Sequence, residues 1–315
     1  MTNSFEITYL TNDQIDRALW DRCIDRSING MEYAKSWYLD LVADDWDALV
    51  EKDYVSVFPL VFRKKWNIRY IYQPYFTQQL GLFSSQLLNA SRLEAFFRAI
   101  PHQFKFIEMN LNTLNKADLP GAEVSHWLNH ELDLIHPYEQ LRAHYSANHI
   151  RNLKKAEEAG LTLQHNIKPE EVINMFRENR GKNLSKITDD DYKLLSRLIH
   201  TAIYKGLAEV YGVYSRTNNL CAGAVFLTSG KKKIFLFSGL NDEGRKNRAM
   251  VWLIDRFIEK YQRQHLTLDF EGSNDPGLAR FYKGFGSTPV TYPHVVINRL
   301  PAVIRALAPL YRRLK

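Results

Sequence analysis

Only two cysteines, Cys23 and Cys221, occur in the 315-residue sequence. Because they lie far apart in the chain, they form neither a disulfide framework nor a zinc knuckle, which suits a reducing compartment. No apolar run approaches the roughly 18 residues that a membrane-spanning helix needs. The N-terminal segment has neither the basic region nor the apolar region of a signal peptide. The sequence therefore predicts a cytoplasmic protein.

Short motifs for metal binding and for several kinds of catalysis are also absent. The ten histidines show no metal-ligand spacing. His126 and His130 are four residues apart, but they fall in a predicted strand and would not share a helix face. Neither a G-x-S-x-G elbow nor a Walker loop occurs. We therefore expect no metal site.

The sequence does contain enough apolar residues for a real core, since 45% are hydrophobic and 13% aromatic.

The charge of the sequence is distributed unevenly along the chain. Residues 1–140 hold 13 Lys and Arg against 19 Asp and Glu, whereas residues 141–315 hold 29 against 16. A basic second half predicts contact with a polyanion or a phosphate-bearing ligand, and the alternative is a basic surface without a partner.

Hydrophobic periodicity and turn residues predict alternating helices and strands in the first half. We expect strands at 6–10, 46–52, 54–64, 68–73, 105–112 and 123–134, and helices at 13–23, 34–41 and 91–100. Pro59, inside the third of these strands, predicts an edge position or a bulge.

The second half follows a similar order. We expect helices at 138–145, 147–159, 169–180, 188–204, 245–264 and 275–283, and strands at 208–215, 220–228, 233–238, 266–271 and 290–298. Ser146 and Thr188 are the expected helix caps. The pattern predicts an α/β (α+β) fold of two lobes, each with a mixed, mostly antiparallel sheet flanked by helices. A single mixed sheet with insertions is the alternative.

The most informative stretch is LTLDFEGSNDPGLARFYKGFG, residues 266–286. It predicts a buried strand, a small polar loop and a short helix that ends in glycine. Asp269, Glu271, Ser273 and Tyr282 thus lie close together where a strand is followed by a helix, and ligands collect at such strand ends in α/β sheets.

At this point the chain resembles a known superfamily. The elements over 208–298, with the aromatic–Tyr–x–Gly helix ending, are similar to the GNAT acyltransferase fold. Two such lobes in one chain resemble the Fem-type peptidyltransferases and their FemAB-like relatives. The resemblance spans roughly residues 30–300, and three segments carry it: SANHIRNLKKAEEAG (146–160), DFEGSNDPGLARFYKGFG (269–286) and YIYQPYFTQQLGLFS (70–84).

The resemblance implies a GNAT-like lobe at 1–137 and a second at 138–298 that carries the donor site. It also implies an N-acyltransferase or aminoacyltransferase whose donor is acyl-CoA or aminoacyl-tRNA, with no metal. The implied acceptor is an amine, with a peptidoglycan precursor as the candidate.

The donor loop of GNAT enzymes corresponds here to residues 243–249. This stretch keeps a basic start and the closing Ala249, but Arg248 stands where an inner glycine is usual. Free amides and the dipole at a helix start favour an anion, and a solvated first turn is the alternative. The expected donor-binding residues are Gly244, Arg245, Lys246, Asn247, Arg248 and Ala249, with amides of Ala224, Val225 and Phe226 holding the carbonyl oxygen.

Asp269 and Glu271 have the same parity in the predicted strand, so we expect both on one face. With Ser273 they could take a proton from an amine nucleophile, directly or through water. Alternatively, one of them caps the next helix or pairs with Arg280. The resemblance assigns Tyr282 the protonation of a thiolate or alkoxide leaving group, and core packing is the alternative.

The first lobe offers a candidate acceptor site in one loop after a strand. Aromatic and amide side chains together suit recognition of a peptide or sugar amide. A loop that satisfies its own backbone is the alternative. The residues are Gln73, Tyr75, Phe76, Gln78 and Gln79.

The tail, residues 299–315, has helical apolar spacing with five cations and no acid. Such a basic amphipathic helix can lie on the inner face of an anionic membrane or dock on the second lobe. Docking is favoured, since Pro309 would kink a helix lying on a membrane.

Two hypotheses follow from the sequence. The first is an acyl- or aminoacyl-transferase with the amine acceptor in the cleft between the lobes. The second is a non-catalytic module of the same fold that binds an anionic cell-wall precursor or RNA, including tRNA, and the missing inner glycine favours it.

Overall fold

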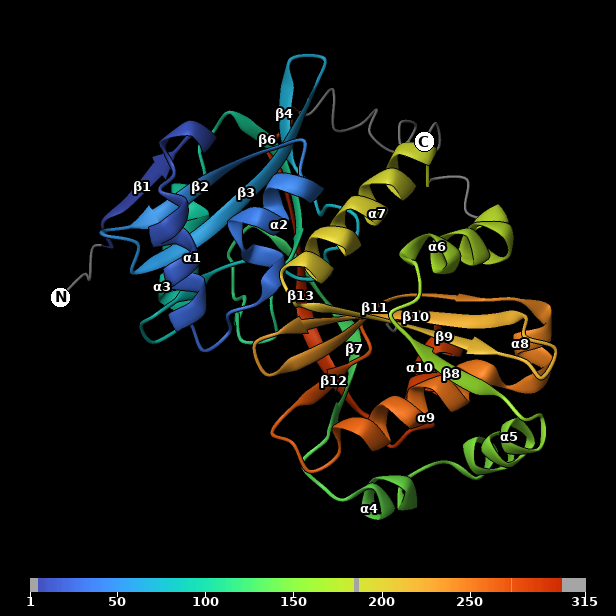
Figure 1. Cartoon of the computed structure of the whole chain (residues 1–315). Coiled ribbons are helices and arrows are strands. Elements are labelled where there is room, and N and C mark those ends of the chain that lie inside the picture. The colour runs from blue at the N-terminus through green and yellow to red at the C-terminus, as the bar shows by residue number, and fades with distance from the viewer. Residues whose placement is uncertain (1–4, 184–186, 273, 302–315) are drawn as a thin grey trace. The chain divides into compact units, whose positions relative to one another are not determined.

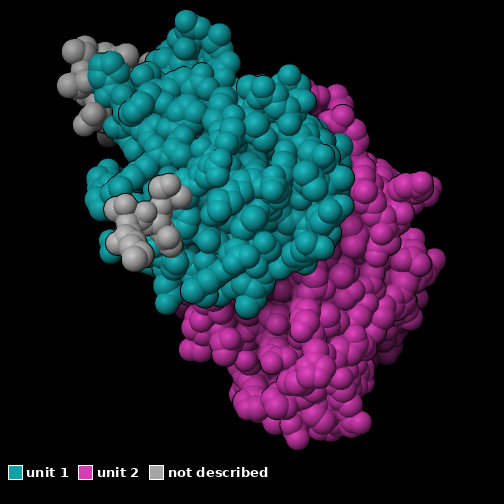
Figure 2. All heavy atoms as spheres, turned by 90° about the vertical axis from the view of Figure 1, so that its left-hand side faces the viewer, with its two compact units in different colours: residues 1–127, 291–315 teal, residues 128–290 magenta. Residues whose placement is uncertain are grey.

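The computed structural model describes residues 5–183, 187–272 and 274–301. The chain divides into two compact units, coloured separately in Figure 2: unit 1 is residues 1–127 with 291–315, and unit 2 is residues 128–290. The chain passes from one unit to the other within two strands, β7 (Glu123–Asp133) and β13 (Thr288–Asn298). The predicted α/β class, with a mixed sheet flanked by helices, is confirmed.

The unit boundaries differ from those expected at 137 and 298, and strand pairing gives the reason. Residues 131–133 of β7 pair with β12 (Thr267–Asp269) inside unit 2. Residues 294–298 of β13 pair antiparallel with β6 (Phe104–Asn110) inside unit 1. The last predicted strand of the second half thus pairs with a strand of the first unit.

Unit 1 is built on a sheet in the order β1-β2-β3-β4-β6-β13, with β5 paired to β3. The bounds are β1 Ile7–Leu10, β2 Asp45–Glu51, β3 Ser56–Lys65, β4 Ile68–Ile71 and β5 Phe83–Ser84. Figure 1 shows its helices, α1 (Arg17–Arg26), α2 (Ser36–Val42) and α3 (Ala90–Ala99). Short 3-10 turns, Asn12–Gln14 and Glu32–Ala34, precede α1 and α2.

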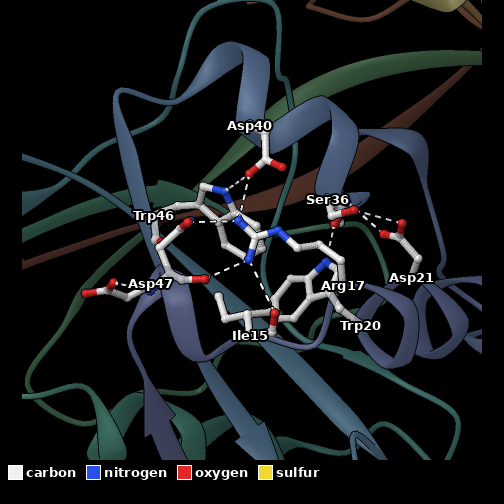
Figure 3. Close-up of polar contacts among 10 residues, drawn as sticks. Ile15, Arg17, Trp20, Asp21, Ser36, Asp40, Trp46 and Asp47 are labelled. Carbon is white, nitrogen blue, oxygen red and sulfur yellow. Dashed lines mark hydrogen bonds and ion pairs between the residues drawn. The ribbon is translucent and has the colours of Figure 1, made fainter.

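Polar contacts join the two N-terminal helices to β2 (Figure 3). The Asp40 carboxylate on α2 accepts from the Arg17 guanidinium at 3.2 Å and from the Trp46 indole at 2.8 Å. Asp21 on α1 accepts from the hydroxyl of Ser36 at 2.8 Å. These bonds fix the helices over a strand whose residues are nearly all buried.

Pro59 lies neither on an edge strand nor at a bulge. β3 has partners on both sides, and Pro59 stands opposite Ala48 in a regular register with β2. On the other side, β5 pairs at Ser56 and Val57, whereas β4 pairs from Phe62 to Lys65. Pro59 falls in the interval between these two partners, where its lack of an N–H does not interrupt a ladder.

Unit 2 contains a sheet in the order β7-β12-β11-β10-β9-β8. Its other strands are β8 Thr162–His165, β9 Ala208–Tyr214, β10 Leu220–Ser229 and β11 Lys232–Leu240, and β11 pairs parallel with β12. The helices are α4 Tyr138–Ala143, α5 Ala147–Glu158, α6 Pro169–Glu178, α7 Asp189–Tyr204, α8 Asp242–Asn247, α9 Ala249–Tyr261 and α10 Pro276–Lys283, with a 3-10 turn at Arg180–Asn183.

Two expected caps in unit 2 are confirmed, and one strand of this unit, β8, was missed. The Ser146 hydroxyl accepts from the His149 amide, and Thr188 forms a capping box with Asp191. β8 was not expected, because its four residues are mostly exposed and give little hydrophobic signal.

Helices cover both faces of the unit 2 sheet (Figure 1). Ala222, Ala224 and Phe226 of β10 belong to the core with α5 and α9. The opposite face carries a row of glycines, since Gly223 stands opposite Gly212 on β9 and opposite Gly239 on β11. A Cβ at Gly239 would lie 2.6 Å from the Val172 carbonyl oxygen, so this row lets α6 pack directly on the strands.

The helix predicted over 245–264 is two helices. Arg248 adopts the left-handed conformation, with φ of 61°, and ends α8 while acting as the N-cap residue of α9. Arg245 and Lys246 therefore belong to the last turn of α8, where cations favour the helix dipole, and not to the first turn of α9.

The described chain ends at Pro301, so the helix expected over 299–315 lies outside the described residues apart from its first three. Among the residues described, no helix is long and apolar enough to cross a bilayer.

Candidate functional site

In the sheet of unit 2, the parallel strands β11 and β12 separate after a short paired stretch. β11 and β12 pair from Lys232–Thr267 to Ile234–Asp269, where β12 ends. β11 continues to Leu240 beyond this point. A register shift against β10 makes Leu236 an extra residue, because Phe226 pairs with Phe235 and Val225 with Phe237. This bulge brings Phe235 onto the same face as Ser238 and Leu240.

A pocket of about 220 Å³ lies where the two strands separate. All of its lining residues belong to unit 2, and they come from α6 and the turn after it, β11, α8, α9 and α10. The wall is mostly aromatic and aliphatic, with four polar side chains. The lining is Phe176, Arg180, Phe235, Ser238, Leu240, Arg245, Met250, Leu278, Phe281 and Tyr282.

Tyr282 presents a phenol to this pocket from α10. Its ring is 6% exposed and stacks on Phe270, with the centroids 4.8 Å apart. The hydroxyl makes no hydrogen bond to any residue that the structure describes. Burial raises the pKa of Tyr282, and the nearby Glu271 carboxylate raises it further. The phenol is therefore held in its protonated form, available to a ligand in the pocket.

Two arginines form the cationic rim of the pocket, Arg180 and Arg245, with about half of each side chain exposed. Arg245 pairs with Asp242 at 3.1 Å and donates to the Asn179 side chain at 3.3 Å. Arg180 lies 3.9 Å from Asp275, the N-cap of α10. Both guanidinium groups are anchored, and their exposure leaves donors for an anionic group at the rim.

The two carboxylates expected on one face have different surroundings. Asp269 is 2% exposed, and its oxygens accept from the Lys232 ammonium at 2.9 Å and from the Asn129 amide at 2.9 Å. Burial lowers the pKa of Lys232, but the neighbouring Asp269 and Glu131 carboxylates raise it. The net result is a pKa above the usual value. Asp269 is thus the anion of a buried ion pair.

Glu271 lies beyond the end of β12, with φ of 56°, so the strand alternation that predicted a shared face does not reach it. Its backbone amide donates to Asp269 at 3.0 Å. Burial raises the pKa of the Glu271 carboxyl well above its usual range. Once a carboxyl with such a pKa is ionised, it accepts a proton more readily than an ordinary carboxylate does.

The expected donor loop packs on the sheet through Gly244. A Cβ there would lie 2.0 Å from the Cys221 carbonyl oxygen, so only glycine fits. Lys246 and Arg248 are exposed, Asn247 is half-buried and Ala249 is buried at the start of α9. Arg245 alone of the expected loop residues lines the pocket.

Ala224, Val225 and Phe226 lie in the middle of the sheet. β10 pairs with β9 on one side and with β11 on the other at all three positions. Their amides face neighbouring strands, whereas the pocket is lined by the next strand, β11. Ser273 lies outside the described residues.

The loop residues expected to bind an acceptor are divided between structural and exposed positions. Gln73 donates to the Thr77 carbonyl and accepts from the Asn110 amide, and Gln79 accepts from the Thr113 amide. These glutamines satisfy the loop backbone. Tyr75 is 43% exposed, and Phe76 and Gln78 are half-buried. All of these residues belong to unit 1.

Sequence reasoning missed Arg180, Ser238 and the aromatic lining. Arg180 stands in a basic, glycine-containing stretch at the end of α6, a composition that could have signalled an anion site. Ser238 gave no signal, because the bulge that directs its face appears only in the strand pairing.

Among the comparisons with known proteins, the one with solved structures identifies the fold. No family model matches the sequence, and no curated protein matches it. The crystal structure of FemX superposes with a TM-score of 0.67 at 14% identity, covering 95% of this chain and 98% of that one. The chain has a FemAB-like, GNAT-type acyltransferase fold. The resemblance inferred from the sequence is confirmed at this level.

Two further solved structures share this fold. L-PGS from Bacillus licheniformis has a TM-score of 0.55 at 10% identity, with 95% of this chain and 96% of that chain covered. The C-terminal domain of a putative lysylphosphatidylglycerol synthetase from Agrobacterium fabrum has a TM-score of 0.54 at 9% identity, with 94% and 96% covered. One of these neighbours bears the name of a synthetase, and because the identities are low, the similarity shows the fold alone.

Residues 5–183, 187–272 and 274–301 contain no group of three or more His, Cys, Asp or Glu side chains that could hold a metal ion.

Proposed function

We propose that the protein is an acyl- or aminoacyl-transferase that moves an activated acyl group onto an amine. The observation that carries this proposal is the pocket at the separation of β11 and β12. It combines an apolar wall, a protonated phenol at Tyr282 and a rim of two arginines in one small volume. Apolar pockets with a few convergent polar groups are the usual form of a small-molecule site.

The donor in this proposal is a phosphate-bearing ester or thioester, acyl-CoA or aminoacyl-tRNA. Arg245 and Arg180 contact its phosphate, because guanidinium groups bind phosphate oxygens with paired, charge-assisted hydrogen bonds. The acyl arm enters between Phe235 and Tyr282 and follows the edge of β11. Backbone groups of β11 past Ile234 are the candidates for holding the donor carbonyl, in place of those of β10.

The chemistry needs one proton acceptor and one proton donor. The amine nitrogen attacks the acyl carbonyl carbon, and Glu271 in its ionised form takes a proton from that nitrogen, directly or through water. The bond from the carbonyl carbon to the leaving sulfur or oxygen then breaks. Tyr282 gives its proton to that atom, and the phenolate recovers a proton from solvent. Asp269 acts as a positioning residue, since it holds the Glu271 amide and the Lys232 ammonium.

The acceptor class follows from the resemblance to Fem-type enzymes, which implies a cell-wall precursor that carries an amine. Tyr75, Phe76 and Gln78 stay the proposed acceptor contacts, since Gln73 and Gln79 are engaged by the loop backbone.

One observation favours the alternative, a non-catalytic module that binds an anion. Arg248 occupies a left-handed position with an exposed side chain where GNAT loops have glycine, so the backbone at this turn carries a bulky cation. Such a surface binds polyanions without requiring an acyl group.

Thermal-shift titration with acetyl-CoA, longer acyl-CoAs, charged tRNA and uncharged tRNA at two salt concentrations tests the proposal. We expect a salt-tolerant shift with one donor class, lost in Arg245→Glu and kept in the control Arg151→Glu on the exposed face of α5. A shift with any polyanion that falls steeply with salt would favour the binding module. No shift with any of these compounds would contradict the donor assignment.

A further inference from the structure

A cationic hairpin with an exposed tryptophan lies in unit 1, whereas the residues that line the pocket belong to unit 2. It joins β3 to β4, and Figure 1 shows it extending past the neighbouring strands. Its sequence, Arg63-Lys-Lys-Trp-Asn-Ile-Arg69, holds four cations. No Asp or Glu occurs between Asp53 and Glu94, although the first half of the chain is acidic overall.

Trp66 stands at the tip of the hairpin, where the Lys65 ammonium lies 5.3 Å from the centroid of its ring. Its side chain is 67% exposed. Trp66 and Asn67 both have positive φ, 47° and 62°, which is the geometry of a two-residue hairpin turn that favours Asn and Gly. A large aromatic residue at such a position costs conformational energy and exposes apolar surface to water. A partner that accepts an indole would offset both costs.

The cations lie directly behind the tryptophan. Lys64 stands opposite Arg69 in the strand pairing, so two like charges face each other across the hairpin. Like charges directly opposite each other destabilise a strand pair. Burial raises the pKa of Asp47 and the Arg69 charge acts to lower it, so this carboxylate offsets part of the repulsion. Arg63 is paired with Asp44, and the Arg69 guanidinium lies 5.2 Å from the Phe62 ring centroid. Lys64 and Lys65 are exposed.

The end of the described chain lies beside this hairpin. Tyr70 on β4 pairs with Phe106 on β6, and Phe106 pairs with Asn298 on β13. The Arg299 amide donates to the Lys105 carbonyl at 2.8 Å, level with Arg69 and Tyr70. The sequence that follows, residues 302–315, holds four more cations and no acid: Arg305, Arg312, Arg313 and Lys315. Arg69 of the hairpin and Arg299 thus lie at the same end of the unit 1 sheet.

We propose that this end of unit 1, the hairpin 63–69, docks on an anionic lipid surface. An indole at the tip with lysines and arginines behind it matches the interface of a bilayer, where tryptophan lies at the headgroup level and cations meet anionic lipid. The order of the groups along the hairpin, aromatic first and cations next, favours a membrane over a nucleic acid. This inference is independent of the transfer chemistry in unit 2.

Co-sedimentation of the full-length protein with phosphatidylcholine vesicles, with and without phosphatidylglycerol, tests the proposal. We expect binding only where phosphatidylglycerol is present. The Lys64→Gln/Lys65→Gln variant should bind those vesicles roughly 30-fold more weakly, about fivefold for each cation removed. The control Lys154→Gln/Lys155→Gln removes two exposed cations from α5 and should bind as the wild type does.

Trp66→Asn keeps the turn, since asparagine tolerates positive φ, and should also weaken binding. The wild type should show a blue shift of tryptophan emission on anionic vesicles that this variant lacks. Equal binding to neutral vesicles, no vesicle binding, or hairpin variants that bind like the wild type would overturn the proposal. Hairpin-dependent binding of tRNA without vesicle binding would assign the surface to nucleic acid instead and would overturn it too.

Discussion

Asp269 accepts a hydrogen bond at 3.0 Å from the backbone amide of Glu271, while its other oxygen accepts from the Lys232 ammonium at 2.9 Å. The buried Asp269 carboxylate thereby fixes the backbone at Glu271. The two acids, although close in the sequence, have separate roles. Asp269 stabilises the strand end, and Glu271 carries the exchangeable proton in the proposed transfer.

Asp269→Asn should lower the free energy of unfolding by about 3 kcal/mol, because it leaves the buried Lys232 ammonium with one of its two anions. Urea unfolding measures the change. Glu271→Gln is the matched control and should cost under about 1 kcal/mol, because burial already favours the neutral carboxyl there. Equal losses in both variants would contradict the separation of roles.

Glu271→Gln should instead reduce the rate of acyl transfer by about two to four orders of magnitude, since a glutamine amide cannot take the amine proton. In the wild type, kcat should rise with pH through an acid limb above the ordinary carboxylate range, because the raised pKa of Glu271 delays its ionisation. The pH profile of single-turnover transfer checks this. Unchanged turnover in the variant would remove Glu271 from the mechanism.

Tyr282→Phe should keep the fold and the affinity for the donor, because the ring still stacks on Phe270. Its kcat should fall by about 10²-fold or more, with the larger effect on donors with the more basic leaving group. Comparison of thioester and oxygen-ester donors measures this. A phenylalanine variant with full activity on both donors would leave Tyr282 a packing residue.

Gly239→Ala should destabilise unit 2 by about 1 to 3 kcal/mol, because its Cβ would lie 2.6 Å from the Val172 carbonyl oxygen of α6. The shift of α6 should also weaken donor binding, since Phe176 on this helix lines the pocket. Gly272→Ala is the control for stability, because its Cβ would meet nothing within 4 Å. A stable Gly239 variant would show that α6 can move away from the sheet.

Glu209 supplies a pH-dependent part of the stability. Burial alone raises the pKa of Glu209. Hydrogen bonds from Lys260, Tyr261 and Lys233 outweigh burial and lower this pKa to about 2. A carboxylate with a lowered pKa stabilises the fold above its ordinary pKa of 4.5, and this contribution disappears as the pH falls toward 2.

The Glu209→Gln variant should therefore be about 2 to 3 kcal/mol less stable than the wild type near neutral pH. The difference should shrink between about pH 4.5 and pH 3, and urea unfolding at several pH values measures it. A constant difference over this range would show that packing alone, and not the charge, accounts for the loss.

The sequence predicted the elements well where local chemistry decides them. The caps at Ser146 and Thr188 and most strand positions follow from side chains that act within one turn or one strand. The prediction of a single helix over 245–264 was wrong. The apolar spacing continues through one left-handed residue, Arg248, and hydrophobic periodicity does not reveal such a residue.

The candidate site was predicted in part. Tyr282 and Arg245 were expected and do line one pocket, whereas Arg180 and Ser238 were not expected. Asp269 and Glu271 were expected as a pair on the assumption that the strand extends to 271, and β12 ends at Asp269. Their surroundings depend on Lys232, Asn129 and Glu131, which come from other strands.

The sequence by itself determined the kind of fold, the order of its elements and the stretch 266–286 as the place to look, because composition, periodicity and motif all act along the chain. Only the tertiary structure decided that β13 pairs with β6, where β11 and β12 separate, and which carboxylate is held in an ion pair. These outcomes depend on contacts between residues far apart in sequence, such as β13 with β6 and Lys232 with Asp269, and no local pattern encodes such contacts.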